Sequence, residues 1–145
     1  MKALVVRVHK AEIKVREKII SSIKDGIVLF LGIAKKDTDE SLLRIADKVV
    51  NLRIFEDEKG KLQFSLKEKN CSLMCISNFT LCANTNKGRR PSFEEVMCAK
   101  DAREIFDNFV VLLRSKGIDV KEGIFGEHME IDLEMDGPLN IVLSD

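Results

Sequence analysis

The chain has 145 residues, of which 45% are hydrophobic and 33% charged, so it can bury a core and is not a disordered sequence. Lysine and arginine number 24, as do aspartate and glutamate, so the formal net charge is zero. This balance excludes a general electrostatic attraction to nucleic acid or to an anionic membrane, while a local basic patch remains allowed. The length favours one domain spanning residues 1–145.

Neither a membrane segment nor a metal site is expected. The longest apolar run, residues 27–31, is far shorter than the roughly 20 residues of a membrane helix, and Arg7 interrupts the N-terminal segment too early for a signal peptide. The four cysteines form no C-x-x-C pair, and His9 and His128 lie at opposite ends of the chain. We therefore expect a cytoplasmic protein with reduced cysteines, no metal and no cofactor.

The first part of the chain alternates between apolar and polar residues, as β-strands do. Residues 3–8 and 11–15 predict two strands with a short connection, and residues 18–23 predict a third. Asp25-Gly26 is a turn signal, and the apolar residues 27–33 suit a central strand.

A helix and a hairpin are expected next. Asp37 and Glu40 have the spacing of a capping box, so the helix should begin there. Apolar residues then follow at helical spacing: Leu42, Ile45, Ala46, Val49 and Val50. Residues 53–55 and 62–66 flank a polar, glycine-containing turn and therefore predict a hairpin.

The middle of the chain combines a strand, a loop and a second helix. Residues 72–76 form a short apolar strand, and residues 84–91 form a polar loop. Residues 99–116 carry one apolar stripe, and Gly117 is placed to end that helix.

The last segments predict strands at Val120, at residues 129–133 and at residues 139–143, with Asp136-Gly137-Pro138 as a turn between the last two. Two long helices among many short strands indicate an α+β fold. Its mostly antiparallel sheet is large enough to curl toward a barrel.

Two segments could carry chemistry. Residues 77–81 leave a buried strand with two hydroxyls and an amide, but no base lies nearby in sequence, so the hydroxyls of Ser77 and Thr80 could equally be structural. Residues 86–93 offer three cations that could hold phosphates or simply be solvated: Lys87, Arg89 and Arg90. His9 and His128 could act as acid–base groups, although a lone histidine is more often structural.

Taken together, several segments resemble the D-aminoacyl-tRNA deacylase family, in order and spacing, from Met1 to Leu143. The matching stretches are residues 3–8 with Arg7, 51–57 ("L-R-I-F-x-D"), 77–81 ("S-Q-x-T-L"), 88–93 ("G-x-R-P-S-F"), 123–126 with Met129, and 136–138 ("N-x-G-P-V-T"). This sequence departs from the usual residues at Asn78, Glu127, Met135, Leu139 and Asn140.

The resemblance implies a homodimer in which each subunit completes the other's pocket. Gly137 and Pro138, joined by a cis peptide bond, would enter the partner's pocket and offer main-chain carbonyls to the α-ammonium of a D-amino acid. An L-residue would have to place its side chain where this backbone lies, so it would be rejected.

The implied reaction is hydrolysis of the ester that joins an amino acid to the terminal ribose of tRNA. The implied catalytic segment is Ser77-Asn78-Phe79-Thr80, with main-chain amides near Phe79 and Thr80 stabilising the developing negative charge. Thr80 as a nucleophile remains an alternative.

The implied partner is the acceptor end of aminoacyl-tRNA with its terminal adenosine, and Lys87, Arg89 and Arg90 are candidate phosphate contacts. Two other functions stay open at this point. One is the same fold with relaxed chirality, acting on certain L-aminoacyl-tRNAs. The other is a non-catalytic dimer that binds the end of tRNA.

Overall fold

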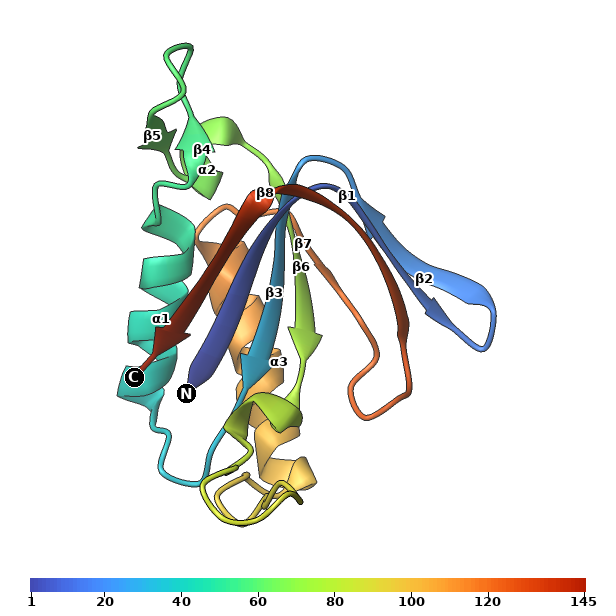
Figure 1. Ribbon diagram of the computed structural model, residues 1–145. Helices are drawn as coiled ribbons and strands as arrows, with labels where there is room; N and C mark the ends of the chain where they lie inside the picture. Colours follow the sequence, from blue (N-terminus) through green and yellow to red (C-terminus); the bar gives the residue numbers. More distant parts are fainter.

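The structure, a computed structural model, describes residues 1–145 and is organised around one large sheet (Figure 1). The strand order is β2-β1-β3-β6-β7. Strand β8 lies off this path and pairs antiparallel with β1. The strands of this sheet are β1 (Lys2–Val15), β2 (Lys18–Ile23), β3 (Gly26–Gly32), β6 (Ser72–Ser77), β7 (Val120–Glu122) and β8 (Glu130–Ser144). The remaining elements are α1 (Asp39–Asn51), β4 (Phe55–Glu56), β5 (Leu62–Phe64), α2 (Leu66–Lys69), the 3₁₀ helix η1 (Phe79–Cys82) and α3 (Ala99–Ser115).

The expected α+β class is confirmed, and the sheet curls into a nearly closed barrel. The sheet is mixed in direction: β1 pairs antiparallel with β2, β3 and β8, whereas β3-β6 and β6-β7 are parallel. Neighbouring parallel strands must be joined by a long crossover connection. Helix α1 lies in the connection from β3 to β6, and α3 lies in the connection from β6 to β7. The short helix α2 was not expected from the sequence.

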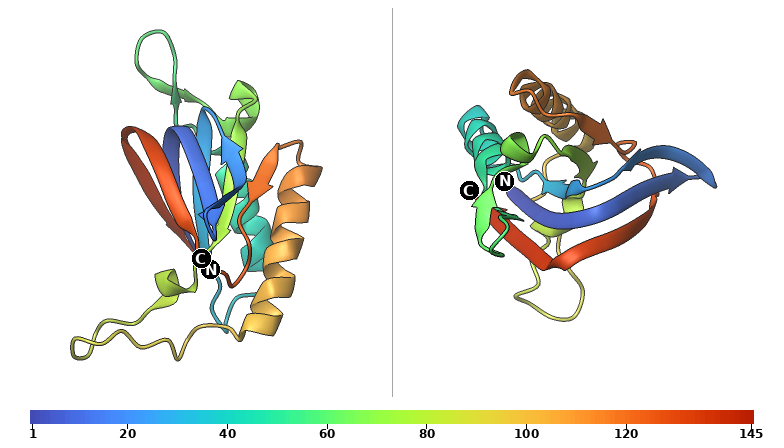
Figure 2. Two further views of the ribbon diagram at one scale, coloured as in Figure 1. Left: turned by 90° about the vertical axis from the view of Figure 1, so that its right-hand side faces the viewer. Right: turned by 90° about the horizontal axis from the view of Figure 1, so that it is seen from above.

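The strand β1 is continuous, so the expected break between residues 3–8 and 11–15 is wrong. β1 pairs with β3 as far as Val8 and with β2 from Ala11 onward. His9 and Lys10 lie between these partners and are exposed, which is why a polar pair is tolerated there. Because β8 runs beside β1 from Lys2 to Lys14, it keeps the whole of β1 extended (Figure 2).

The strand β8 is also continuous, so the expected turn at Asp136-Gly137-Pro138 is wrong. Asn140 lies opposite Val6 and Met135 lies opposite Val8, so residues 136–139 face the single residue Arg7. Such an excess of residues on one strand is a bulge, which bends the strand and leaves part of it unpaired. The sequence signals a local irregularity here, and pairing with β1 on both sides carries β8 through the bend as one strand (Figure 1).

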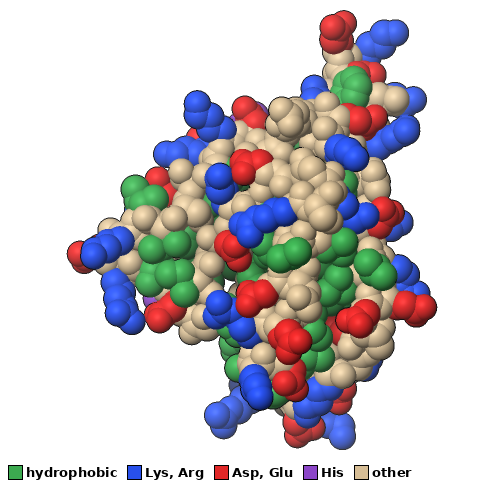
Figure 3. All heavy atoms as spheres, turned by 180° about the vertical axis from the view of Figure 1, so that it is seen from behind, with side chains coloured by type: hydrophobic (Ala, Val, Ile, Leu, Met, Phe, Trp, Pro, Cys, Tyr) green, Lys and Arg blue, Asp and Glu red, His purple; other side chains and the backbone are tan.

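Helices α1 and α3 cover one face of the sheet, and the larger buried cluster lies between them and that face (Figures 1 and 2). A smaller buried cluster lies on the other face, within the curl of the sheet. The outer side of the helices mixes lysine, arginine and carboxylate side chains with scattered hydrophobic ones (Figure 3). No helix has the length and apolar character that crossing a membrane requires.

The start of α1 lies one residue later than expected. Thr38 is the N-cap: its Oγ1 accepts from the N–H of Ser41 at 3.4 Å, and the Ser41 Oγ accepts from the N–H of Thr38 at 3.3 Å. Asp37 is buried instead, where it accepts from the N–H of Ala34 at 2.7 Å and contacts the Met1 ammonium. The capping box expected at Asp37 and Glu40 is therefore wrong, because the Asp37 carboxylate is already occupied.

We expect Thr38→Ala to lower the free energy of unfolding by about 1 kcal/mol, because it removes the acceptor for an otherwise unpaired helix N–H. Thr38→Ser keeps the hydroxyl and should stay near the parent value. Urea denaturation of the two variants checks this. Equal stability of both variants would show that the cap contributes nothing.

Candidate active site

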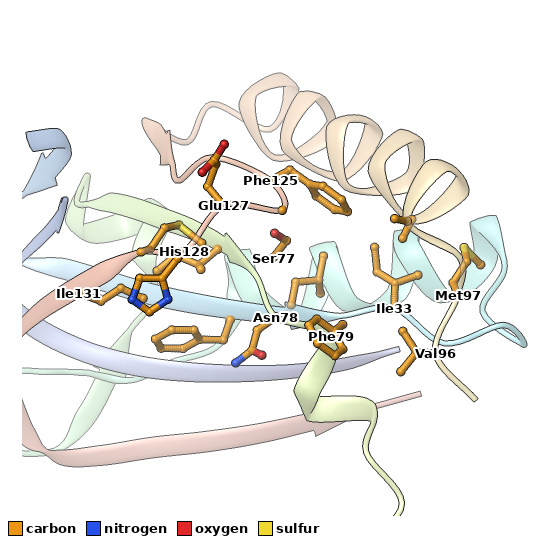
Figure 4. Close-up of a pocket in the computed structure, with 17 residues that line it drawn as sticks. Ile33, Ser77, Asn78, Phe79, Val96, Met97, Phe125, Glu127, His128 and Ile131 are labelled. Atoms are coloured by element: carbon orange, nitrogen blue, oxygen red, sulfur yellow. The ribbon is translucent and has the colours of Figure 1, made fainter. Parts of the chain in front are cut away.

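A cavity of about 500 Å³ opens between the end of the sheet, the start of α3 and the segment before β8. Figure 4 shows Ser77 in its middle, with Asn78 and Phe79 below it and Phe125 above. The lining is mostly apolar and consists of Phe30, Leu31, Ile33, Ile76, Ser77, Asn78, Phe79, Val96, Met97, Ala99, Ala102, Phe125, Gly126, Glu127, His128, Met129 and Ile131. Such an apolar cavity with a few polar groups is the usual form of a small-molecule site.

The end of β6 and the residues that follow it bring three of the four expected catalytic residues to this cavity. Ser77 ends β6, Asn78 caps η1, and Phe79 begins η1. The N–H of Asn78 donates to the carbonyl of Leu31 at 2.8 Å, which fixes the segment to the end of β3. Thr80 is not part of the lining.

The polar groups of this segment largely satisfy one another. The Asn78 Oδ1 accepts from the N–H of Thr80 at 3.2 Å and from the Thr80 hydroxyl. An amide oxygen is not a base, so this contact does not activate Thr80 as a nucleophile. Phe79 is the first residue of a helix, where an N–H has no acceptor within the helix. The N–H of Phe79 is therefore a main-chain donor of this segment that is left without an acceptor.

The basic loop lies beside the cavity and outside its lining. Main-chain hydrogen bonds between Asn84 and Ser92, at 2.8 and 2.9 Å, close the base of the loop. Phe93, which follows, contacts Phe79 edge to face with ring centroids 5.2 Å apart. The three loop cations expected to contact tRNA, Lys87, Arg89 and Arg90, are all exposed.

Gly137 and Pro138 do not line the cavity of their own chain. They lie in the β8 bulge opposite Arg7, and both are exposed. The expected cis bond between them is confirmed. Gly137 has φ +151°, and a Cβ added there would lie 2.1 Å from the main-chain nitrogen of Leu139, so no other residue fits without a shift of the backbone.

Arg7 holds this bulge in place. Its Nη2 donates to Asp136 Oδ1 at 3.2 Å, its Nε lies 2.8 Å from Asp136 Oδ2, and its Nη1 donates to the carbonyl of Ile54 at 2.6 Å. Nη2 also lies 3.3 Å from Glu56 Oε1. These contacts are charge-assisted, and they are shielded on the arginine side: the Arg7 side chain is only 7% exposed, whereas Asp136 and Glu56 are 32% and 50% exposed.

At the surface, His9 lies next to the Asp136 carboxylate that Arg7 contacts. Its Nδ1 lies 2.9 Å from Asp25 Oδ1, and its Nε2 lies 3.7 Å from Asp136 Oδ1. The hydrogen bond with Asp25 raises the pKa of His9 above its ordinary value, and the charge of Asp136 acts in the same direction. His9 is thus a neighbour of the bulge and lies outside the cavity lining.

The sequence named His128 as a possible acid–base group and Glu127 as a departure from the family pattern, but it did not place either of them in a cavity. Both line the cavity because a turn brings them there: the N–H of Glu127 donates to the carbonyl of Ile124 at 3.2 Å, with Gly126 at φ +80°. The Glu127 carboxylate points away from Ser77 and lies 3.6 Å from an Arg16 nitrogen (Figure 4). In the sequence, the two glycines Gly123 and Gly126 are the signal that could have indicated this turn.

The cysteines offer no activated nucleophile in this site. None of them lines the cavity, and burial raises the pKa of the Cys71, Cys75 and Cys82 thiols. No group of three or more histidine, cysteine, aspartate or glutamate side chains is arranged to hold a metal ion.

Comparison with known sequences identifies the family. A family model described as D-Tyr-tRNA(Tyr) deacylase matches residues 4–144. The chain is 45% identical to a D-aminoacyl-tRNA deacylase of Clostridium perfringens over 143 residues, which are 99% of this chain and 96% of that one. It is 48% identical to a protein of the same name from Kosmotoga olearia, with the same coverage. The chain therefore belongs to the D-Tyr-tRNA(Tyr) deacylase family.

Two solved structures share the fold. One, a protein named c-Myc DNA Unwinding Element Binding Protein, matches with a TM-score of 0.95 and 37% identity, covering 100% of this chain and 99% of that one. The other, a probable eukaryotic D-amino acid tRNA deacylase, matches with a TM-score of 0.86 and 17% identity, covering 98% and 97%. At that lower identity the second match speaks for the fold alone.

We expect Arg7→Met to lower the free energy of unfolding by about 2 kcal/mol, because it leaves the Ile54 carbonyl without its donor and the half-buried Asp136 carboxylate without its main partner. The matched control is Arg103→Met, which breaks an exposed ion pair with Asp107 on α3 and should change stability by less than about 1 kcal/mol. Chemical denaturation of both variants measures the difference. Equal effects would contradict a special role for Arg7.

Proposed function

We propose that this protein is an editing hydrolase that cleaves the ester bond of D-aminoacyl-tRNA and releases the free amino acid and tRNA. The observation that carries the proposal is the apolar cavity at the end of β6, lined in part by Phe79, whose N–H has no acceptor, in a chain that matches the deacylase family over almost its whole length. Residues 1–145 act as one domain. The reaction belongs in the cytoplasm, where aminoacyl-tRNA is used.

The hydrolysis needs little from side chains. Water adds to the ester carbonyl carbon, the bond between that carbon and the ribose oxygen breaks, and one proton of the water passes to the ribose oxygen. The N–H of Phe79 donates to the carbonyl oxygen as it becomes negative, which is the contribution of an oxyanion hole. Ser77 and Asn78 shape the wall, and the ribose 2′-hydroxyl assists the proton transfer.

Thr80 positions the segment in this mechanism. Its hydroxyl donates to Asn78 Oδ1, which in turn accepts from the N–H of Thr80, so the two residues hold the start of η1 together. The absence of a base next to Thr80 supports this role over that of a nucleophile.

Thr80→Ala should therefore lower kcat on D-tyrosyl-tRNA by less than about tenfold, the value of one lost hydrogen bond. Loss of a true nucleophile lowers kcat by about a millionfold in a serine protease. Single-turnover kinetics on Thr80→Ala, with Thr80→Ser as the matched control, decides whether Thr80 positions the segment or acts as the nucleophile. Abolished hydrolysis with intact substrate binding would refute the main-chain mechanism.

Chiral selection comes from the partner subunit. Gly137 and Pro138 are exposed and lie outside the cavity of their own chain, which supports their insertion into a second copy. There the carbonyls of the partner's Gly137 and the partner's Pro138 accept from the α-ammonium of a D-residue. The Arg7 contacts keep this backbone rigid, so an L side chain meets main chain that cannot rotate away.

An apolar stripe on the sheet supports such a dimer. Val142 lies opposite Leu4, and Leu4 lies opposite Phe30, so the three side chains share the face that the helices leave open. Val142 is 71% exposed, and Phe79 and Phe93 at the end of the sheet are also exposed. Exposed apolar patches of this kind mark interaction surfaces.

The protein should remove D-tyrosine from tRNA more than about 200-fold faster than L-tyrosine. That factor is the upper limit of discrimination by one methylene of fit, and a clash with backbone should exceed it. Glycyl-tRNA, which has no side chain to exclude, should be partly hydrolysed. Parallel assays at equal enzyme concentration test this. Similar rates on D and L substrates would favour the relaxed-chirality alternative, and binding without ester loss would favour the non-catalytic one.

Light scattering at micromolar concentration should give twice the mass of one 16.4 kDa chain. Val142→Asp should reduce this mass to that of a monomer, because it places a charge in the apolar stripe. Val111→Asp is the matched control, since Val111 is 63% exposed but lies on α3, and it should stay dimeric. A monomeric parent protein would refute the dimer.

A further inference from the structure

Two loops that are distant in sequence run side by side at the end of the molecule that holds the cavity. Ala34 and Val96 form an isolated β-bridge, and the N–H of Lys35 donates to the carbonyl of Glu95 at 2.9 Å. The N–H of Met97 donates to the carbonyl of Ile33 at 3.2 Å. These bonds join the loop after β3 to the segment that follows the basic loop.

The same pairing connects both loops to the rim of the cavity. Ile33, Val96 and Met97 all line the cavity. Lys35 is two residues beyond Ile33, so its Cα lies within about 7 Å of Ile33 along the chain. The extended side chain of a lysine at this position can reach a group that protrudes from the cavity.

The lysines of this loop carry unneutralised charge. Lys35 and Lys36 are both exposed, and neither forms an ion pair. Asp37, the next residue in the chain, is buried and occupied by the Met1 ammonium and the N–H of Ala34, so it does not neutralise them. Glu94 and Glu95, on the paired segment, are exposed and form no ion pair with either lysine. Lys87, Arg89 and Arg90 across the rim likewise form no ion pair, so cations border the cavity from two loops.

We propose that Lys35 and Lys36, together with Lys87, Arg89 and Arg90, form one phosphate-binding surface that holds the acceptor end of the tRNA. This surface, the basic rim, rests on the proposed function and extends it. The main-chain bonds fix the loop after β3 to the segment that follows the basic loop. Five cations carried by these two loops can contact phosphates of a single strand that leaves the cavity. The zero net charge of the chain is compatible with tRNA binding at the basic rim, because the phosphates are attracted by cations that are concentrated at one end of the molecule.

The test compares the double variants K35E/K36E and K59E/K61E. The second is the matched control, with the same change of charge on the loop between β4 and β5 at the opposite end of the molecule (Figure 1). Each is assayed on D-tyrosyl-tRNA and on D-tyrosyl-adenosine, which has the ester but no phosphate. At 50 mM salt K35E/K36E should raise KM for D-tyrosyl-tRNA about tenfold, as expected for two lost phosphate contacts, and the difference should shrink at 200 mM.

On D-tyrosyl-adenosine both variants should match the parent protein, which also shows that they are folded. A K35E/K36E protein that equals K59E/K61E on D-tyrosyl-tRNA would overturn the basic rim while the proposed function stands. A K35E/K36E protein impaired on both substrates would also overturn it, because the effect would then not depend on phosphate. A parent protein that hydrolyses neither substrate would overturn the proposed function and the basic rim with it.

Discussion

The contact between Arg7 and Asp136 is the constraint on which the geometry of this protein depends. β1 and β8 pair along nearly their whole length, but four residues of β8 face Arg7 alone. Without a partner, a bulge with an exposed glycine would be free to move. The guanidinium of Arg7 binds the Asp136 carboxylate on one side and the carbonyl of Ile54 on the other. It thereby fixes the bulge to the segment before the β4–β5 hairpin, a part of the chain far away in sequence.

The sheet separates the two parts on which the proposed selective hydrolysis depends. Its parallel half, where β6 follows the α1 crossover, ends in Ser77, Asn78 and η1 and borders the cavity. Its antiparallel half carries Gly137 and Pro138 on β8, outside that cavity. A single chain thus holds a cavity and a Gly137-Pro138 segment that do not meet. In the proposed mechanism, a second copy docked on the open apolar face of the sheet brings the two together on one substrate.

Much of this could be predicted from the sequence, and the failures have physical causes. Periodicity identified both long helices, and the resemblance to the deacylase family pointed to Ser77-Asn78-Phe79, which line the cavity, and to the cis bond between Gly137 and Pro138. Strand continuity was missed at His9 and at Asp136 because it depends on pairing with a neighbouring strand, which no local pattern records. The cap was misplaced because the Asp37 carboxylate is occupied by partners outside the helix. The contacts of Arg7 and the entry of His128 into the cavity are likewise tertiary, and only a folded chain could reveal them.

The central claim is that the cavity of one subunit works with the Gly137-Pro138 segment of the other, and a mixed dimer tests it most directly. One chain carries Ser77→Phe, which fills the cavity, and the other carries Gly137→Ala, whose Cβ would collide with the main chain of Leu139. Each homodimer should be inactive on D-tyrosyl-tRNA. The purified heterodimer should regain about half of the parent activity, because one of its two sites has both parts intact. A heterodimer as inactive as the two homodimers would contradict the account, since it would mean that each site is built from a single chain.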